Sequence, residues 1–393
     1  MENLQPKLRF PEFKEDWIQK PLKEIGKIIG GGTPSTSIES YWEGNIPWIS
    51  SSDIFNNNIN NISVSKYISE DAIKNSATKL IKKNSLLVVS RVGVGKFAVN
   101  NFDLCTSQDF ANIIVDDNKS NTKYLAYNLL SRRSVLLNIS QGTSIKGFTN
   151  NDLYNLKLTI PTLQEQTKIA DFLGAVDKQL DILNQKKEKL NLYKKGVMQQ
   201  LFAQQLRFKD DNGNNYPDWQ EKTLGEVAIC LNNVRKPLNG IQRNNMKGIY
   251  PYWGANNIVD YVNDYVVDDE IVLLAEDGGN FHEFKEKPIA NYFIGKCWVN
   301  NHTHILKGTE SLLTKYLFYT LQHKDITHLI TGGTRTKLTK ASMLEIRIDI
   351  PSLNEQTKIA NFLSAIDNQI EAVENQITKT ETYKKGLLQQ MFV

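Results

Sequence analysis

The chain has 393 residues, of which 40% are hydrophobic and 23% are charged, and its formal net charge at pH 7 is +4. This composition is that of a globular protein long enough for two or three domains, each with its own core. No apolar run approaches the roughly 18 residues of a membrane span, and the N-terminus lacks the apolar stretch of a signal peptide. The small positive charge permits nucleic-acid binding but does not by itself indicate it.

The three cysteines, Cys105, Cys230 and Cys297, lie far apart in the sequence, and their number is odd. Such a set does not suggest a disulfide framework, and it contains no CxxC pair of the kind that binds zinc. Isolated cysteines are typical of proteins in a reducing compartment. We therefore predict a cytoplasmic protein without a metal site of its own.

The sequence pattern of the first 160 residues is that of a globular domain built from short secondary-structure elements. Apolar, β-branched runs at residues 86–90 and 113–115 alternate with loops rich in Asn, Ser, Gly and Thr, which predicts short strands and long loops. Residues 124–137 have the apolar spacing of a helix. The stretch is therefore predicted to form a mixed α/β domain over residues 1–160.

Two segments of about forty residues, 160–202 and 350–392, repeat one another. Their offset is 190 positions throughout without a gap, and roughly half of the positions are identical. In the first copy Thr162 can act as a helix N-cap, and Glu165 follows three residues later as in a capping box. The chain is therefore a tandem duplication, and each repeat is predicted to end in a helix of about 60 Å.

Both repeated helices carry an apolar seam in which steps of three and four residues alternate, the spacing of a coiled coil. The seam is interrupted at Lys187 in the first copy and at Thr380 in the second, which would help to fix the register. Because an isolated helix with such a stripe is unstable, each copy is predicted to pack against the other; the alternative is packing of each helix on its own domain. The residues predicted at this interface are Leu173, Val176, Leu180, Leu183, Leu190, Leu363, Ile366, Ile370, Val373 and Ile377.

The second globule resembles the first at its two ends and differs in its middle. Both open on an Arg-Phe pair that leads to a tryptophan, Trp17 or Trp219, and both close on a phrase that runs from Gly-Thr to Ile-Pro. Because the ends of the two globules are similar in sequence and their middle segments differ, we expect two domains of similar framework that present different surfaces. The predicted order is a domain over residues 1–160, a helix over 161–206, a second domain over 207–350 and a second helix over 351–393.

No motif for nucleotide or zinc chemistry is complete. The run Gly93-Val94-Gly95-Lys96 resembles part of a phosphate-binding loop, but the upstream glycine and the downstream Ser/Thr are missing. His302 and His304 have no third ligand at metal-binding spacing, so hydrogen bonding within a loop or strand is the simpler interpretation.

One catalytic alternative stays open. Asp277, Glu283 and Lys285 loosely match the carboxylate and lysine pattern of nucleases, in which the carboxylates hold Mg²⁺. Short acidic and basic triplets of this kind arise easily, as Glu12-Phe13-Lys14 shows. The chain as a whole is therefore predicted to be non-catalytic, with a metal-dependent nuclease as the runner-up.

The loops of both globules carry side chains suited to DNA. Arg and Lys can pair with guanine, Asn and Gln with adenine, and Ser and Thr can reach either a base or a phosphate. In the first globule the candidates are Thr33, Ser35, Ser50, Ser51, Ser52, Arg91, Lys96, Gln108, Thr143 and Lys146. In the second they are Arg235, Lys236, Gln242, Arg243, Asn244, Asn257, Asn280, Thr334, Arg335 and Lys337. For any single residue, an ordinary solvated loop position is the alternative.

Several phrases together resemble a known family. They are GGTPS at residues 31–35, YWEGNIPWISSSDI at 41–54, the two Gly-Thr to Ile-Pro closing phrases, and the EQTKIA segments that begin both helices at Glu165 and Glu355. With them the chain resembles the DNA-specificity subunit of type I restriction–modification enzymes. The resemblance covers essentially the whole chain, and the duplicated architecture makes it more specific than any single motif.

The resemblance implies an α+β fold. Two mixed α/β target-recognition domains would be separated by two long helices that form an antiparallel coiled coil, in a pseudo-twofold tandem repeat. The implied chain is not an enzyme and has no cofactor, because S-adenosylmethionine, ATP and Mg²⁺ are used by partner subunits. The implied partners are double-stranded DNA, two modification (methyltransferase) subunits, and the restriction and translocase subunits held through them, with no membrane. A scaffold that binds only proteins is a further alternative.

Overall fold

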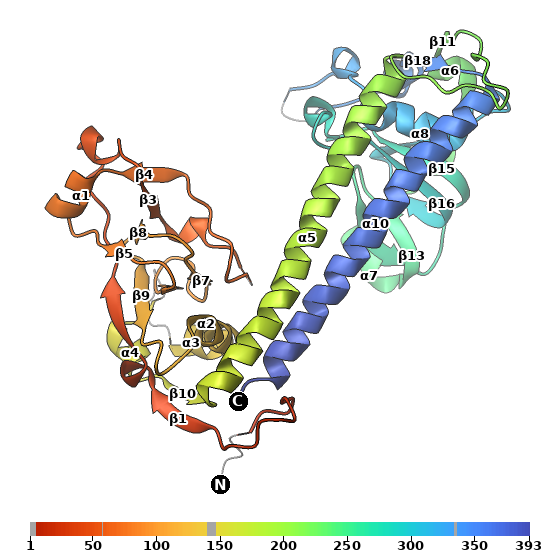
Figure 1. The fold of residues 1–393 in the computed structure, drawn as a ribbon. Helices are drawn as coiled ribbons and strands as arrows, with labels where there is room; N and C mark the ends of the chain where they lie inside the picture. Colours follow the sequence, from red (N-terminus) through yellow and green to blue (C-terminus); the bar gives the residue numbers. More distant parts are fainter. Residues whose placement is uncertain (1–4, 57, 140–146, 334–335) are drawn as a thin grey trace. The chain divides into compact units, whose positions relative to one another are not determined.

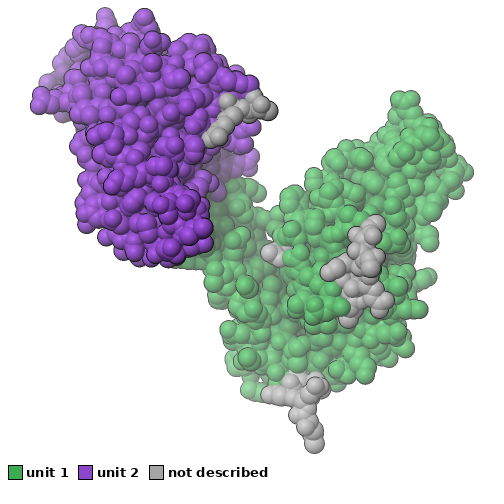
Figure 2. All heavy atoms as spheres, turned by 180° about the vertical axis from the view of Figure 1, so that it is seen from behind, with its two compact units in different colours: residues 1–186, 373–393 green, residues 187–372 purple. Residues whose placement is uncertain are grey.

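The computed structural model describes residues 5–56, 58–139, 147–333 and 336–393, which divide into two compact units (Figure 1; green and purple in Figure 2). Unit 1 consists of residues 1–186 and 373–393, and unit 2 of residues 187–372. The division cuts both long helices near their middles, whereas the sequence predicts each helix as a segment of its own. Unit 2 is thus one continuous stretch, and unit 1 is assembled from both ends of the chain.

The two repeated segments form the long helices α5 (Leu163–Phe202) and α10 (Leu353–Gln390). In unit 1, Lys384 near the end of α10 lies 2.5 Å from Asp177 in the first half of α5. In unit 2, Lys194 near the end of α5 lies 2.6 Å from Asp367 in α10. A step of 17 residues forward along α5 thus matches a step of 17 residues back along α10, so the helices pair antiparallel. The predicted fold class is confirmed.

The seam between the helices is partly polar. The ten apolar residues predicted at the interface are all buried or half-buried, with Leu173 and Leu363 fully buried. Lys194 and Lys384 also occupy seam positions. Each forms an ion pair with an aspartate of the facing helix. Because a polar residue in a coiled-coil seam stabilises one register over others, these lysines help to set the antiparallel alignment.

The described part of unit 1 forms one two-stranded and two four-stranded sheets. The first pairs β1 (Ile18–Pro21) with β10 (Lys157–Ile160), antiparallel. The second has the order β2 (Gly26–Gly30), β9 (Phe110–Val115), β6 (Leu86–Val89), β7 (Phe97–Val99). The third has the order β4 (Lys66–Ile68), β3 (Ile46–Ile49), β8 (Leu104–Thr106), β5 (Leu80–Ile81). Its helices besides the halves of α5 and α10 are α1 (Glu70–Asn75), α2 (Thr122–Ser131), α3 (Arg133–Ile139) and α4 (Asn150–Tyr154).

The core of unit 1 requires the end of the chain. Helix α2 buries Tyr124, Leu125 and Tyr127 in a cluster that includes Leu173 of α5 and Phe392 just beyond α10. The rings of Tyr124 and Phe392 lie 5.5 Å apart. The sequence predicts one helix over residues 124–137, whereas the structure has two, α2 and α3, which meet at Arg132.

Unit 2 repeats this plan around one larger sheet. The strand order is β12 (Ala228–Cys230), β17 (Thr303–Gly308), β15 (Val267–Ala275), β16 (Ala290–Val299), β13 (Lys247–Trp253), β14 (Ile258–Val262). A two-stranded sheet pairs β11 (Gln220–Thr223) with β18 (Arg347–Ile350). Its helices besides the halves of α5 and α10 are α6 (Leu224–Val227), α7 (Gly240–Asn245), α8 (Thr314–Gln322) and α9 (Lys340–Leu344).

The same set of contacts connects each globule to a long helix: a buried glutamate of the helix accepts hydrogen bonds from an arginine and a tryptophan of the globule. We call this set the joint. In unit 1 the fully buried carboxylate of Glu165 accepts two hydrogen bonds of 2.8 Å from Arg9 and one of 3.3 Å from Trp17. In unit 2, Arg207 and Trp219 donate to Glu355 in the same way. The sequence predicts a capping box at Glu165, but its carboxylate binds Arg9 and Trp17 instead, so only the Thr162 half of that box is present.

The cysteines differ in accessibility, which gives a direct chemical test. Cys105 and Cys297 are fully buried, and burial raises the pKa of the Cys105 thiol to about 11 and that of Cys297 to about 12. Cys230 is half-buried. Because the thiolate is the reactive species, an aromatic disulfide reagent at pH 8 is expected to modify Cys230 alone in the native chain and all three cysteines in denaturant. Rapid reaction of two thiols in the native chain would contradict this.

Among the described residues, no helix combines the length and the apolar character needed to cross a membrane.

Candidate nucleic-acid interface

Four loops of unit 1 meet at one edge of its sheets. Strands β3 and β8 are parallel neighbours, so the loops that follow them leave at the same edge. Strands β2 and β6 both pair antiparallel with β9, which places their C-terminal ends beside its start at Phe110. We call these four loops, residues 31–35, 50–53, 90–96 and 107–109, the unit 1 rim.

Hydrogen bonds join the loops of the unit 1 rim. The Lys96 ammonium donates to the Ser51 carbonyl at 2.9 Å, and the Ser90 amide donates to the Asp109 carbonyl at 2.8 Å. The Thr33 hydroxyl donates to the Gln108 side-chain oxygen. A Cβ on Gly31 would collide with the Ser107 carbonyl, so glycine is required where the GGTPS loop lies flat on the neighbouring loop. The rim is therefore a connected surface.

The DNA-binding candidates of the first globule gather at the unit 1 rim but differ in exposure. Thr33, Ser35, Ser52, Arg91 and Gln108 are exposed, and Ser50 and Lys96 are half-buried. Ser51 is buried and offers only its carbonyl, which Lys96 already contacts. Thr143 and Lys146 lie outside the described residues. The structure therefore brings eight of the ten candidates together and leaves seven with accessible side chains.

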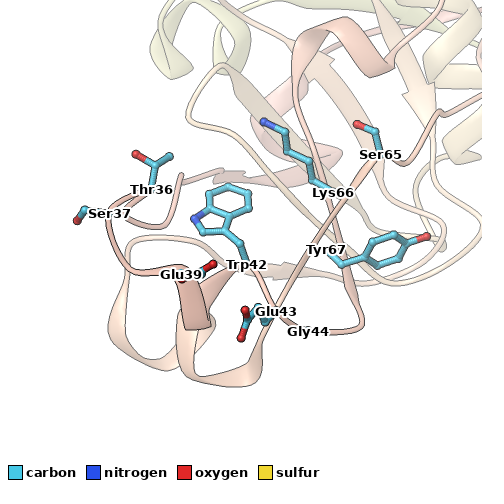
Figure 3. A pocket seen from close by; sticks show the side chains of 9 residues that line it. All are labelled: Thr36, Ser37, Glu39, Trp42, Glu43, Gly44, Ser65, Lys66 and Tyr67. Carbon is cyan, nitrogen blue, oxygen red and sulfur yellow. The ribbon is translucent and has the colours of Figure 1, made fainter.

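An open pocket of about 850 Å³ lies beside the unit 1 rim (Figure 3). Lys66 lies over the rings of Trp42 and Trp48, at 5.7 and 5.8 Å from their centroids. The indole N–H groups of Trp42 and Trp48 donate to the carbonyls of Ser35 and Gly32, so both tryptophans anchor the GGTPS loop. The exposed carboxylates of Glu39 and Glu43 line the same pocket and make it unsuited to a phosphate.

The basic candidates of unit 2 are largely neutralised. Arg235 donates to the Glu276 carboxylate at 2.6 Å, and the Lys337 ammonium lies 3.6 Å from Glu276 and 3.7 Å from Asp277. Arg243 lies 3.3 Å from the carboxylate of Asp260. An arginine held in this way must break an ion pair before it can bind a base. Sequence alone did not reveal this, because nothing in it shows which carboxylates face these cations.

The remaining candidates of unit 2 fall into two groups. Gln242 and Asn244 belong to α7 with Arg243, and Gln242 caps that helix through Asn239. Asn257 and Asn280 lie in loops, and the Asn280 amide donates to the Pro288 carbonyl. Lys236 is exposed, and Thr334 and Arg335 lie outside the described residues.

The structure does not support the nuclease alternative. Asp277 is held by His302 at 3.0 Å, whereas Glu283 pairs with Lys287, and Lys285 lies over the Phe284 ring. No group of three or more metal-ligating side chains capable of holding an ion occurs within residues 5–56, 58–139, 147–333 and 336–393.

His304 has a structural role. Its side chain is fully buried, burial lowers its pKa, and the neutral ring bonds the Leu338 carbonyl at 2.9 Å and the Asn232 amide at 2.8 Å. Hydrogen bonding was the simpler interpretation of this histidine, and the structure confirms it.

Two polar clusters that contact the long helices are not among the predicted site residues. In unit 1, Asp177 accepts a hydrogen bond of 2.6 Å from the Tyr127 hydroxyl and pairs with Lys384. In unit 2, Tyr319 and Lys194 contact Asp367 in the same way. The signal for these contacts is present in the repeat, since each aspartate and each lysine recurs at the offset of 190.

Fold and loops together define the class of protein: a duplicated scaffold in which two globules, fastened to paired helices by identical joints, present unlike polar surfaces. The family described as type I restriction modification DNA specificity domain matches residues 14–192 and 216–381, one match for each repeat. The chain belongs to this family. It is a specificity subunit of a type I restriction–modification system.

Known relatives agree with this assignment. The type I restriction enzyme MjaIX specificity subunit of Methanocaldococcus jannaschii is 26% identical over 364 residues, which cover 82% of each chain. A Haemophilus influenzae chain, described as a candidate subunit of the same kind, is 41% identical over 145 residues, or 36% of its own length. The crystal structure of the type I system S subunit from M. genitalium has the same fold, with a TM-score of 0.67, 16% identity and 99% coverage of both chains.

Proposed function

We propose that this chain is the non-catalytic, sequence-specific DNA-binding subunit of its complex, and that it recognises a bipartite, asymmetric site with an unread spacer. Each unit contacts one half-site. Partner subunits then methylate adenine or restrict the DNA, and they use S-adenosylmethionine, ATP and Mg²⁺, none of which this chain binds. Two modification subunits dock on the features that both repeats share, and the restriction and translocase subunits assemble through them in the cytoplasm.

One observation carries this proposal: the joints are the same in both units, whereas the loop surfaces are not. Glu165 with Arg9 and Trp17 is reproduced by Glu355 with Arg207 and Trp219. The unit 1 rim, by contrast, exposes Arg91 and Gln108, whereas the matching edge of unit 2 holds an acidic pair, Glu276 and Asp277. Shared joints suit two copies of one partner, and unlike edges suit two different half-sites.

The direct test is methylation mapping in cells that express the chain with its modification subunits. We expect methylated adenines only within one bipartite motif, and none when the chain is omitted. The variant Gln108→Ala, which removes an exposed rim side chain, is expected to relax the first half-site and leave the second unchanged. Asn244→Ala in unit 2 is the matched control and is expected to affect the second half-site alone. Changes in both half-sites from either variant would overturn the two-reader assignment.

The unread spacer should depend on the long helices. From their length we expect a spacer of about five to eight base pairs, since half-sites on one face of DNA lie about one turn apart. Four residues add about 6 Å to a helix. Inserting four after Gln185 in α5 and four after Asn375 in α10, which are opposite positions in the antiparallel pair, should lengthen the preferred spacer by about one or two base pairs. Modification of the original spacer only would show that the helices do not set this distance.

A further inference from the structure

One turn occupies the same place in both repeats. In unit 1 the Phe148 amide donates to the carbonyl of Ser90, which follows β6. In unit 2 the Leu338 amide, 190 positions later, donates to the carbonyl of Glu276, which follows β15. Ser90 therefore corresponds to Glu276, and two residues further along Val92 corresponds to Gly278.

Both of these residues have a left-handed backbone, but only one is suited to it. The φ angle is 38° at Val92 and 63° at Gly278. Glycine adopts positive φ without steric cost, whereas the branched Cβ of valine crowds the neighbouring peptide groups. Three non-glycine residues within the described ranges have positive φ, namely Asn84, Val92 and Gln204, and of these Val92 is the β-branched one. The first repeat thus keeps a strained side chain where the second has none.

Core packing does not explain this valine, because the residue is 54% exposed. The turn around it is nevertheless held in place: the amides of Ser90 and Arg91 both donate to the Asp109 carbonyl, and Gly95 packs against the Arg133 side chain. Val92 is therefore an apolar group presented on a fixed turn among the exposed polar side chains of the unit 1 rim. Strain that persists without a packing reason is characteristic of functional positions.

We propose that Val92 is a specificity-determining residue of the first half-site and contacts the C5-methyl group of a thymine. This inference rests on the proposed function. The C5-methyl group of thymine is the apolar feature that distinguishes a base in the major groove, and it is recognised by apolar side chains rather than by hydrogen bonds. Arg91, next to Val92 on the same turn, supplies a charge for the adjacent guanine or phosphate. The corresponding turn of unit 2 cannot make this contact at Gly278, because glycine lacks a side chain.

The test removes the C5-methyl group of thymine and the side chain of Val92 in turn. Binding of the assembled complex is measured on duplexes that carry its own mapped site, with every thymine replaced singly by deoxyuridine, which lacks only the C5-methyl. For the natural chain we expect a roughly three- to five-fold loss at one thymine of the first half-site, the amount that burial of one methyl group provides. Val92→Gly should bind the thymine and deoxyuridine duplexes equally, and its melting temperature should not fall, since glycine relieves the strain. Val259→Ala, which shortens an exposed valine of unit 2, is the matched control and should keep the thymine dependence.

Three binding results would overturn this inference and leave the proposed function intact: specific binding without any thymine dependence in the first half-site, a first half-site without an A·T pair, or a thymine dependence that survives Val92→Gly. A fall in the melting temperature of Val92→Gly would show that the valine serves folding and would also overturn it. Absence of sequence-specific binding by the natural complex would instead overturn the proposed function, and this inference with it.

Discussion

Replacing Lys384 with methionine is expected to lower the free energy of unfolding by about 3–5 kcal/mol, because it leaves a buried carboxylate without its counter-charge. Asp177 is 1% exposed and Lys384 is 4% exposed. The Lys384 ammonium lies 2.5 Å from Oδ1 of Asp177, an oxygen that accepts no well-aligned hydrogen bond from the described residues, so the contact is an ion pair. Oδ2 still accepts from Tyr127, whose pKa is raised by burial and by Asp177.

The duplication supplies the control. Lys194→Met removes the corresponding lysine of unit 2, where the side chain of Asp367 is 35% exposed and water can solvate it. The expected loss there is no more than about 1 kcal/mol, as for other partly exposed pairs. Both variants are measured by urea denaturation. The double variant Lys384→Met with Asp177→Asn should recover most of the loss, since no charge then stays buried. Equal losses for the two lysine variants would show that burial is not the cause.

Arg9→Ala is expected to cost about 3–5 kcal/mol for the same physical reason at a different place. Glu165 is fully buried, and of the hydrogen bonds that the described residues donate to its carboxylate, the one from Trp17 remains without Arg9. Arg9→Lys should retain part of the stability, because an ammonium restores the charge but not the two parallel hydrogen bonds. The measurement is again the free energy of unfolding.

The most discriminating test is to rank the variants of this joint by their loss in the free energy of unfolding. Removing the carboxylate as well, in Arg9→Ala with Glu165→Gln, should be less damaging than Arg9→Ala alone, because the neutral amide is cheaper to bury. Arg207→Ala in unit 2 is the matched variant and should behave like Arg9→Ala, since Glu355 is equally buried. A double variant worse than the single one would mean that the Glu165 side chain contributes mainly through other contacts.

The long helices could be predicted from sequence because their information is local and repeated. A constant offset and an apolar period sustained over most of each segment specify α5 and α10 without knowledge of anything else in the chain. The role of Glu165 could not be predicted, because its partner Arg9 is 156 residues away. A nearby capping interaction was the only explanation that the sequence could offer. The division of the chain through the middle of both helices is likewise a consequence of tertiary pairing.

The candidate interface shows the same limit. The loops that form the unit 1 rim could be chosen from their composition, but Ser51 proved to be buried. Arg235 and Lys337 are DNA-binding candidates by their basic side chains alone, and both face Glu276. The sequence shows which side chains are basic, but it does not show which carboxylates neutralise them. Here that depends on the tertiary pairing of Asp277, just after β15, with Lys337. Val92 was not singled out at all, since its backbone conformation has no sequence signal beyond the glycine that follows it.

The way the chain is divided between the units has a consequence for its synthesis on the ribosome. Unit 2 is one continuous stretch, so it is complete once residue 372 has emerged. The first globule emerges earlier but must wait for residues 373–393, which bring Lys384 to Asp177 and Phe392 to Tyr124. At about 5–20 residues per second, the roughly 200 residues after unit 1's first segment take about 10–40 s to make. The half that is translated first is therefore completed last, and a truncation that removes residues 373–393 damages unit 1 rather than unit 2.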